Sequence, residues 1–145
     1  MYYEDFNIGD TYTTPGKTVT EAMITLMVGL GGFVFPLFND EEYAHNTPFG
    51  GCIAPGPMTL FLMGGLEEQS MIYGDDAIAI LGIDNVRFKA PLRACDTIRV
   101  KVEILAKRET SRPNAGIVTH KSNCMNQNGE VIVESESTVL VKKKQ

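Results

Sequence analysis

Few side chains in this sequence could transfer a proton near neutral pH. The histidines are His45 and His120, and Asp40 precedes His45 by five positions. A carboxylate and an imidazole are common partners in general acid–base chemistry. On a helix, however, five positions turn the chain by about 500°, which does not place the two groups on one face. Asp40 and His45 are therefore candidate catalytic residues, beside an interpretation as a helix cap and a surface histidine.

The cysteines are Cys52, Cys95 and Cys124, without any C-x-x-C spacing and without a histidine close to them in sequence. This pattern predicts neither a zinc site nor a disulfide framework, and it is typical of a reducing cytoplasm. We expect Cys52 to be a small buried thiol. The first five residues lack the basic stretch and apolar segment of a signal peptide.

The overall charge is acidic, because 13 Lys and Arg stand against 18 Asp and Glu, for a net charge of -5. A nucleic-acid partner is therefore not expected, and the basic residues Lys142, Lys143 and Lys144 are read as a solvated tail. Residues 22–38 and 43–66 contain no Asp, Glu, Lys or Arg, but glycines and prolines interrupt both stretches. We expect buried segments of one domain, residues 1–145, and no membrane span.

The first half of the sequence predicts helices. Residues 19–32 form an expected helix with Thr18 and Glu21 as a capping box, and residues 40–45 form a short one. Residues 57–73 begin with Pro57, which suits a first helical turn, and then place apolar groups on nearly every face. Such a helix should be enclosed on all sides.

The second half predicts strands. Ile98, Val100, Val102 and Ile104 alternate with polar residues over 97–105, which is typical of a sheet with one buried face. Residues 77–83, 86–89, 116–125 and 131–141 are further expected strands, and Asn128-Gly129 predicts a type I′ hairpin. An antiparallel sheet wrapped around the apolar helix accounts for both halves. The predicted fold is therefore α+β, in the hotdog arrangement.

Several segments resemble the MaoC-like hydratases, the (R)-specific enoyl-CoA hydratases and acyl dehydratases. They are Thr47-Pro48-Phe49-Gly50-Gly51-Cys52-Ile53-Ala54, Val86-Arg87-Phe88-Lys89-Ala90-Pro91 and Asn126-Gln127-Asn128-Gly129-Glu130. The resemblance covers almost the whole chain. It implies a CoA or carrier-protein thioester, bound between the subunits of a dimer with no cofactor. It also implies that the backbone N–H of Gly56 holds the thioester oxygen.

The chain departs from the family where the acid–base chemistry should lie. The family loop reads G-D-x-N-P-x-H, whereas residues 32–40 here place Phe33, Phe35 and Phe38 at the acidic, Asn and His positions. A phenyl ring transfers no proton, and losing one acid–base role costs about 10²–10⁴ in rate. We expect the usual chemistry to be absent or relocated, with Phe35 and Cys52 lining an acyl pocket.

These residues leave several functions open. The chain could be an enoyl-CoA hydratase or acyl dehydratase, a lyase, with a rearranged site at Asp40 and His45. It could be a hotdog thioesterase that uses Asp40 or Glu41 as its base. It could also be a non-catalytic or structural subunit, as a homodimer, a higher oligomer of dimers, or a heteromer with a catalytic MaoC-like homologue. Arg93 is a candidate for CoA phosphates, and His120 is expected to be structural.

Overall fold

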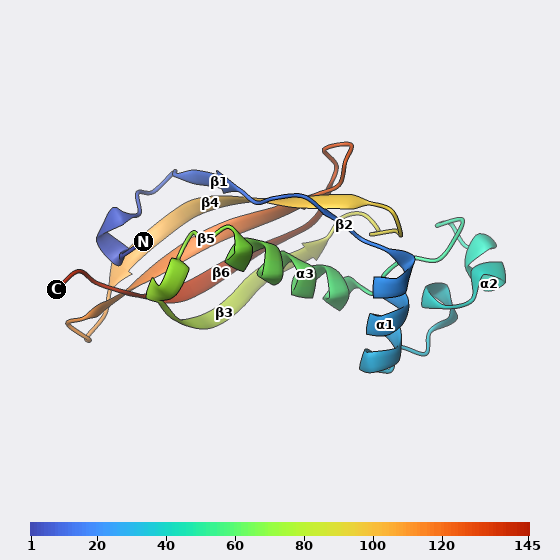
Figure 1. Ribbon diagram of the computed structural model, residues 1–145, viewed down its shortest axis with the longest axis horizontal. Coiled ribbons are helices and arrows are strands. Elements are labelled where there is room, and N and C mark those ends of the chain that lie inside the picture. Colours follow the sequence, from blue (N-terminus) through green and yellow to red (C-terminus); the bar gives the residue numbers. More distant parts are fainter.

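Four long strands dominate the computed structural model, which describes residues 1–145. They are β3 (Ala77–Phe88), β4 (Thr97–Glu109), β5 (Ala115–Met125) and β6 (Val131–Lys142), joined by the short β1 (Thr11–Thr13) and β2 (Lys17–Thr18). All pairings are antiparallel in the order β1-β4-β5-β6-β3, and β2 also pairs with β4. The predicted sheet is confirmed, with β3 at one edge (Figure 1).

The alternation in β4 produces one buried face, as predicted. Ile98, Val100, Val102 and Ile104 are at most 1% exposed, whereas Arg99, Lys101 and Glu103 between them are exposed. The buried face packs against the helix α3 (Gly56–Gln69), which lies across the sheet (Figure 1). The hydrophobic core of the protein is therefore the layer between α3 and the sheet.

Only one side of α3 is covered. Met58, Leu62, Met63 and Leu66 are buried, but Phe61 on the other side is 68% exposed. The prediction that the chain's own sheet encloses this helix on all sides is therefore wrong. A single sheet layer can cover one side of a helix, and nothing in this chain covers the other.

The remaining helices lie beyond the N-terminal end of α3 (Figure 1). They are α1 (Glu21–Gly31) and α2 (Glu41–His45), and the 3-10 turn η2 (Pro36–Phe38) between them contacts α2. The 3-10 turns η1 (Tyr3–Asp5) and η3 (Gly74–Asp76) lie elsewhere. Thr20, not Thr18, caps α1 by accepting from the Met23 N–H. The Thr18 hydroxyl instead contacts that of Thr97 at 2.8 Å, because Thr18 belongs to β2. None of these helices is long and apolar enough to cross a membrane.

Two strand connections differ from the sequence prediction. In the β5–β6 hairpin only Gly129 has a positive φ, of 75°, so the turn is not type I′, which needs two such residues. Glu130 N–H and Asn128 N–H both donate to the side chain of Asn126, which stabilises a longer loop. The predicted segments 77–83 and 86–89 form the single strand β3, with an irregularity between Asp84 and Arg87.

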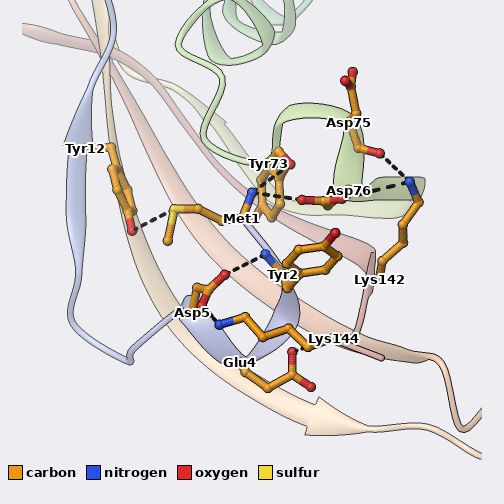
Figure 2. A network of polar contacts seen from close by, with 10 residues as sticks. All are labelled: Met1, Tyr2, Glu4, Asp5, Tyr12, Tyr73, Asp75, Asp76, Lys142 and Lys144. Atoms are coloured by element: carbon orange, nitrogen blue, oxygen red, sulfur yellow. Dashed lines mark hydrogen bonds and ion pairs between the residues drawn. The ribbon is translucent and has the colours of Figure 1, made fainter.

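Polar contacts gather both chain ends near the C-terminal end of α3 (Figure 2). The amino group of Met1 donates to the Tyr73 carbonyl and to Asp76, both at 3.2 Å. Lys142 donates to the Asp75 carbonyl, and Lys144 pairs with Asp5. These contacts hold η3, and Tyr73 before it, against the sheet.

The core layer gives a stability prediction. Ile98→Ala should lower the free energy of unfolding by about 2–5 kcal/mol, because Ile98 is fully buried and its truncation leaves a cavity. Ile8→Ala is the matched control: Ile8 is 67% exposed, and we expect a change within about 0.5 kcal/mol. Urea unfolding measures both. Equal effects of the two substitutions would contradict the described core.

Candidate functional site

The N-terminal end of α3 presents an unused backbone donor at Gly56. Pro55 precedes it without a side-chain cap, and the Gly56 N–H has no acceptor within the protein. The helix dipole places partial positive charge there, which favours an oxygen that carries negative charge. The Phe88 ring packs close by, since a Cβ added to Gly56 would lie 2.8 Å from it. This end of α3 therefore combines a free donor with an apolar cover.

The loop after α1 carries Phe33, Phe35 and Phe38, the positions where the sequence resemblance implies that polar family residues are replaced. The Phe38 ring meets those of Phe33 and Phe35 edge to face, with centroids 5.9 and 5.8 Å away. Phe33 and Phe38 pack partly buried against the core, whereas Phe35 is 50% exposed. The loop is thus an aromatic cluster that offers no proton donor or acceptor at these three positions.

A cavity of about 520 Å³ lies between α1, this loop and the segment before α3. Its apolar wall includes Ile24, Val28 and Ile53, and its polar wall includes Glu41 and Arg93. Among the predicted site residues, Phe38 and Cys52 line this cavity. Gly56, Phe33, Phe35, Asp40 and His45 do not, so the structure brings together only part of the predicted set.

Within the cavity wall, Cys52 lies beside the Glu41 carboxylate. Both carboxylate oxygens are 3.4 Å from the Cys52 backbone nitrogen, which donates to them. Burial, and then the Glu41 hydrogen bond and charge, raise the pKa of the Cys52 thiol to about 11. The sulfur is therefore protonated at neutral pH and a weak nucleophile.

The candidate pair Asp40 and His45 lies at the two ends of α2. The Asp40 Oδ1 accepts from the Tyr43 N–H at 3.0 Å and so caps the helix, as one interpretation predicted. Both side chains are exposed, and no hydrogen bond joins them. A catalytic role for either residue stays a prediction.

A second polar cluster is not predicted from the sequence, which singles out only His120 among its members, as a structural residue. Tyr73, His120, Glu67 and Ser122 are joined by hydrogen bonds at the other end of α3. Their positions are up to 55 residues apart, so no local spacing could reveal them. One sequence signal exists: His120 and Ser122 are two positions apart in the strand β5, so two polar side chains share its buried face. No group of three or more His, Cys, Asp or Glu could hold a metal ion.

The sequence comparisons agree with this architecture. The MaoC like domain model matches residues 5–124. The chain belongs to this family. It is 31% identical over 141 residues to an (R)-specific enoyl-CoA hydratase of Rhodospirillum rubrum, covering 97% of this chain and 91% of that protein. It is also 31% identical to the uncharacterized protein YdeM of Bacillus subtilis, covering 99% and 100%.

Solved structures give the same result. A MaoC-like dehydratase from Rhodospirillum rubrum matches with a TM-score of 0.89 at 29% identity, covering 100% of this chain and 99% of that one. A monoamine oxidase regulatory protein from Archaeoglobus fulgidus matches with a TM-score of 0.92 at 32% identity, covering 100% of this chain and 96% of that one. A Mycobacterium tuberculosis protein with a double hotdog fold matches with a TM-score of 0.84 at 16% identity, covering 99% of this chain and 44% of that one. The MaoC-like chain is thus a hotdog, as predicted.

The environment of Cys52 gives a second prediction. Its alkylation by iodoacetamide should keep accelerating up to about pH 11, because only the thiolate reacts. Glu41→Gln removes the charge that disfavours the thiolate, so the alkylation rate of Cys52 should rise at lower pH than in the natural protein. Glu42→Gln, on the same helix, is the control and should leave the pH dependence of this rate unchanged. Peptide mass mapping quantifies Cys52 separately, and a plateau near the ordinary thiol pKa of about 8.5 would contradict this account.

Proposed function

We propose that this MaoC-like protein binds acyl-CoA or acyl-carrier thioesters, with the thioester oxygen accepting from the Gly56 N–H. The observation that carries the proposal is the unused donor at the positive end of α3, next to an apolar cover. The cavity of about 520 Å³, whose wall includes Ile53 three positions before Gly56, has room for an acyl chain or a pantetheine arm. Family membership supports the same ligand, since the named relatives include an enoyl-CoA hydratase and a 3-hydroxybutyryl-CoA dehydratase.

We further propose that the family's usual proton transfers do not occur at this loop. Phe33 and Phe38 occupy the acidic and histidine positions, and neither ring can accept or donate a proton. Hydration of an enoyl thioester needs both roles. The loop therefore supports binding, and chemistry would need groups from elsewhere in the protein.

Thioester hydrolysis is a second candidate, because Glu41 lies in the cavity wall. Its carboxylate could take a proton from water, whereas the protonated Cys52 is a poor nucleophile beside it. Release of free CoA from crotonyl-CoA, abolished by Glu41→Gln, would support this function. Loss of the conjugated double bond without CoA release would instead indicate hydration.

The Gly56 donor can be tested by calorimetry with crotonyl-CoA and butyryl-CoA. Gly56→Pro removes the N–H, and we expect the Kd to rise about three- to tenfold, the effect of one hydrogen bond. Gly56→Ala retains the N–H and is the matched control; because its Cβ would lie 2.8 Å from the Phe88 ring, both variants are compared in a Phe88→Ala background, where Gly56→Ala should have the smaller effect. No binding by the natural protein, or equal binding by both variants, would contradict the proposal.

Asp40→Asn and His45→Gln test whether these two residues form a rearranged catalytic site. If they do, each substitution should abolish turnover of crotonyl-CoA and leave its Kd unchanged.

We also infer that the protein is a homodimer joined through β3. This strand has no partner on its outer edge, and Ile78, Ile80, Leu81 and Ile83 are between 44% and 61% exposed. An unpaired apolar edge strand is a site for pairing with another chain. A second copy would cover both this edge and the open side of α3, where Phe61 lies.

The dimer gives a fourth prediction. Sedimentation should show twice the 15.9 kDa mass of the chain, and Ile80→Lys should shift the protein toward the monomer. A charged side chain on an edge strand opposes strand pairing. Ile8→Lys makes the same change at another exposed isoleucine and should leave the dimer intact. A monomeric natural protein would exclude the homodimer.

A cytoplasmic location is proposed on the chemistry of the cysteines. Cys52, Cys95 and Cys124 are all free thiols, and Cys95 is exposed. Exposed free thiols persist in a reducing compartment, where disulfide formation is suppressed.

A further inference from the structure

The buried network at the C-terminal end of α3 forms a continuous chain of hydrogen bonds. The Tyr73 hydroxyl lies 2.6 Å from His120 Nδ1, and His120 Nε2 lies 3.3 Å from the Glu67 carboxylate. Ser122 donates to the other Glu67 oxygen at 2.5 Å. An ionised carboxylate only accepts, so Nε2 carries the proton and Nδ1 accepts from Tyr73. This order of carboxylate, imidazole and hydroxyl is suited to proton transfer.

The network borders a second cavity, of about 430 Å³. Its wall includes the apolar Ile78, Ile80 and Val139, together with Glu67, Tyr73 and His120. His120 is 2% exposed, so the imidazole is shielded from bulk water while the cavity reaches it. Burial raises the pKa of Tyr73, and the Glu67 charge adds to this effect, so its ring begins as a neutral phenol.

The network cannot reach Gly56 of its own chain. Gly56 and Glu67 are eleven positions apart on α3, which corresponds to about 16 Å along the helix axis. The strand β3 passes both ends of α3. Its first residues line the second cavity, near Glu67, and Phe88 at its other end packs on Gly56. A two-fold dimer through the β3 edge pairs the strands antiparallel, so the start of β3 in one copy meets its end in the other.

We propose that Tyr73, His120 and Glu67 form an acid–base relay that acts on a 2-enoyl thioester held at Gly56 of a second copy of this chain. The inference rests on the proposed thioester binding and on the β3 dimer. Tyr73 is the catalytic residue because its hydroxyl meets the reacting water. His120 takes its proton, and Glu67 is a positioning residue that acts through His120.

The relay accounts for each bond and proton in the addition of water to the enoyl group. The water oxygen bonds to C3 of the enoyl group, and the π electrons of the C2–C3 bond move toward C2 and the thioester oxygen at the Gly56 N–H. The proton lost by water passes to the Tyr73 oxygen as the Tyr73 proton passes to His120 Nδ1. The Glu67 carboxylate stabilises the resulting imidazolium. Return of one proton along the same path to C2 completes a 3-hydroxyacyl thioester, and the reverse sequence is dehydration.

Mixed dimers of two variants test the relay. Tyr73→Phe keeps the ring but loses the hydroxyl, and Gly56→Pro loses the oxygen-binding N–H; we expect each homodimer to hydrate crotonyl-CoA at least about 100-fold more slowly than the natural protein. Co-expression with two affinity tags isolates the mixed dimer, which keeps one complete site and should regain up to half of the natural turnover. A site built within one chain would regain none. If Gly56→Pro does not fold, Gly56→Val is the second variant for this arm: it keeps the N–H, but its branched side chain crowds the Phe88 ring and obstructs the oxygen site sterically.

Two further readouts separate the relay from a structural role. Tyr73→Phe and Glu67→Gln should lower kcat with the Kd for crotonyl-CoA unchanged within about twofold, because the thioester binds at Gly56. Gln69→Ala, on the same end of α3 but outside the relay, is the control. Binding by the natural protein without hydration or dehydration would overturn the relay and leave the proposed function standing. Absence of binding would overturn both, and an inactive mixed dimer would overturn the arrangement between two copies.

Discussion

The burial of one side of α3 against the sheet is the constraint on which the other features depend. Met58, Leu62 and Leu66 on the helix meet Ile98, Val100 and their neighbours on β4, where the exposed fractions fall to zero. Removing this much apolar surface from water is the largest favourable term available to a chain of this length. It fixes the direction of α3, and thereby the position of its two ends.

Both polar sites follow from that fixed helix. At its start the Gly56 N–H is unused, and the Phe88 ring packs close to Gly56. At its end Glu67 reaches over the sheet to His120 and Ser122 on β5. The free N–H of Gly56 and the Glu67 network therefore lie at opposite ends of one helix. In the dimer proposed above, a second copy related by a two-fold axis would bring these two ends together.

The open side of α3 and the free edge of β3 both lack a partner within the chain. A sheet of a single layer covers half of a helix, so Phe61 stays exposed although the helix sequence is apolar all round. The sequence pattern thus indicated more burial than one chain can supply. The proposed homodimer would supply the missing cover from a second copy of the chain.

Periodicity predicted the long strands β4, β5 and β6, because an alternation such as that of β4 buries one face in any antiparallel sheet. It missed the short strands β1 and β2, and it divided β3 into two segments. Local chemistry also determined the α2 cap at Asp40, whose side chain accepts from the Tyr43 N–H. Tertiary structure decided the rest. Thr18 pairs in a strand where its spacing suggested a cap, because contact with Thr97 outweighs a local signal. The Tyr73, His120 and Glu67 network arises only when a helix end and a strand meet, and sequence spacing carries no record of that contact.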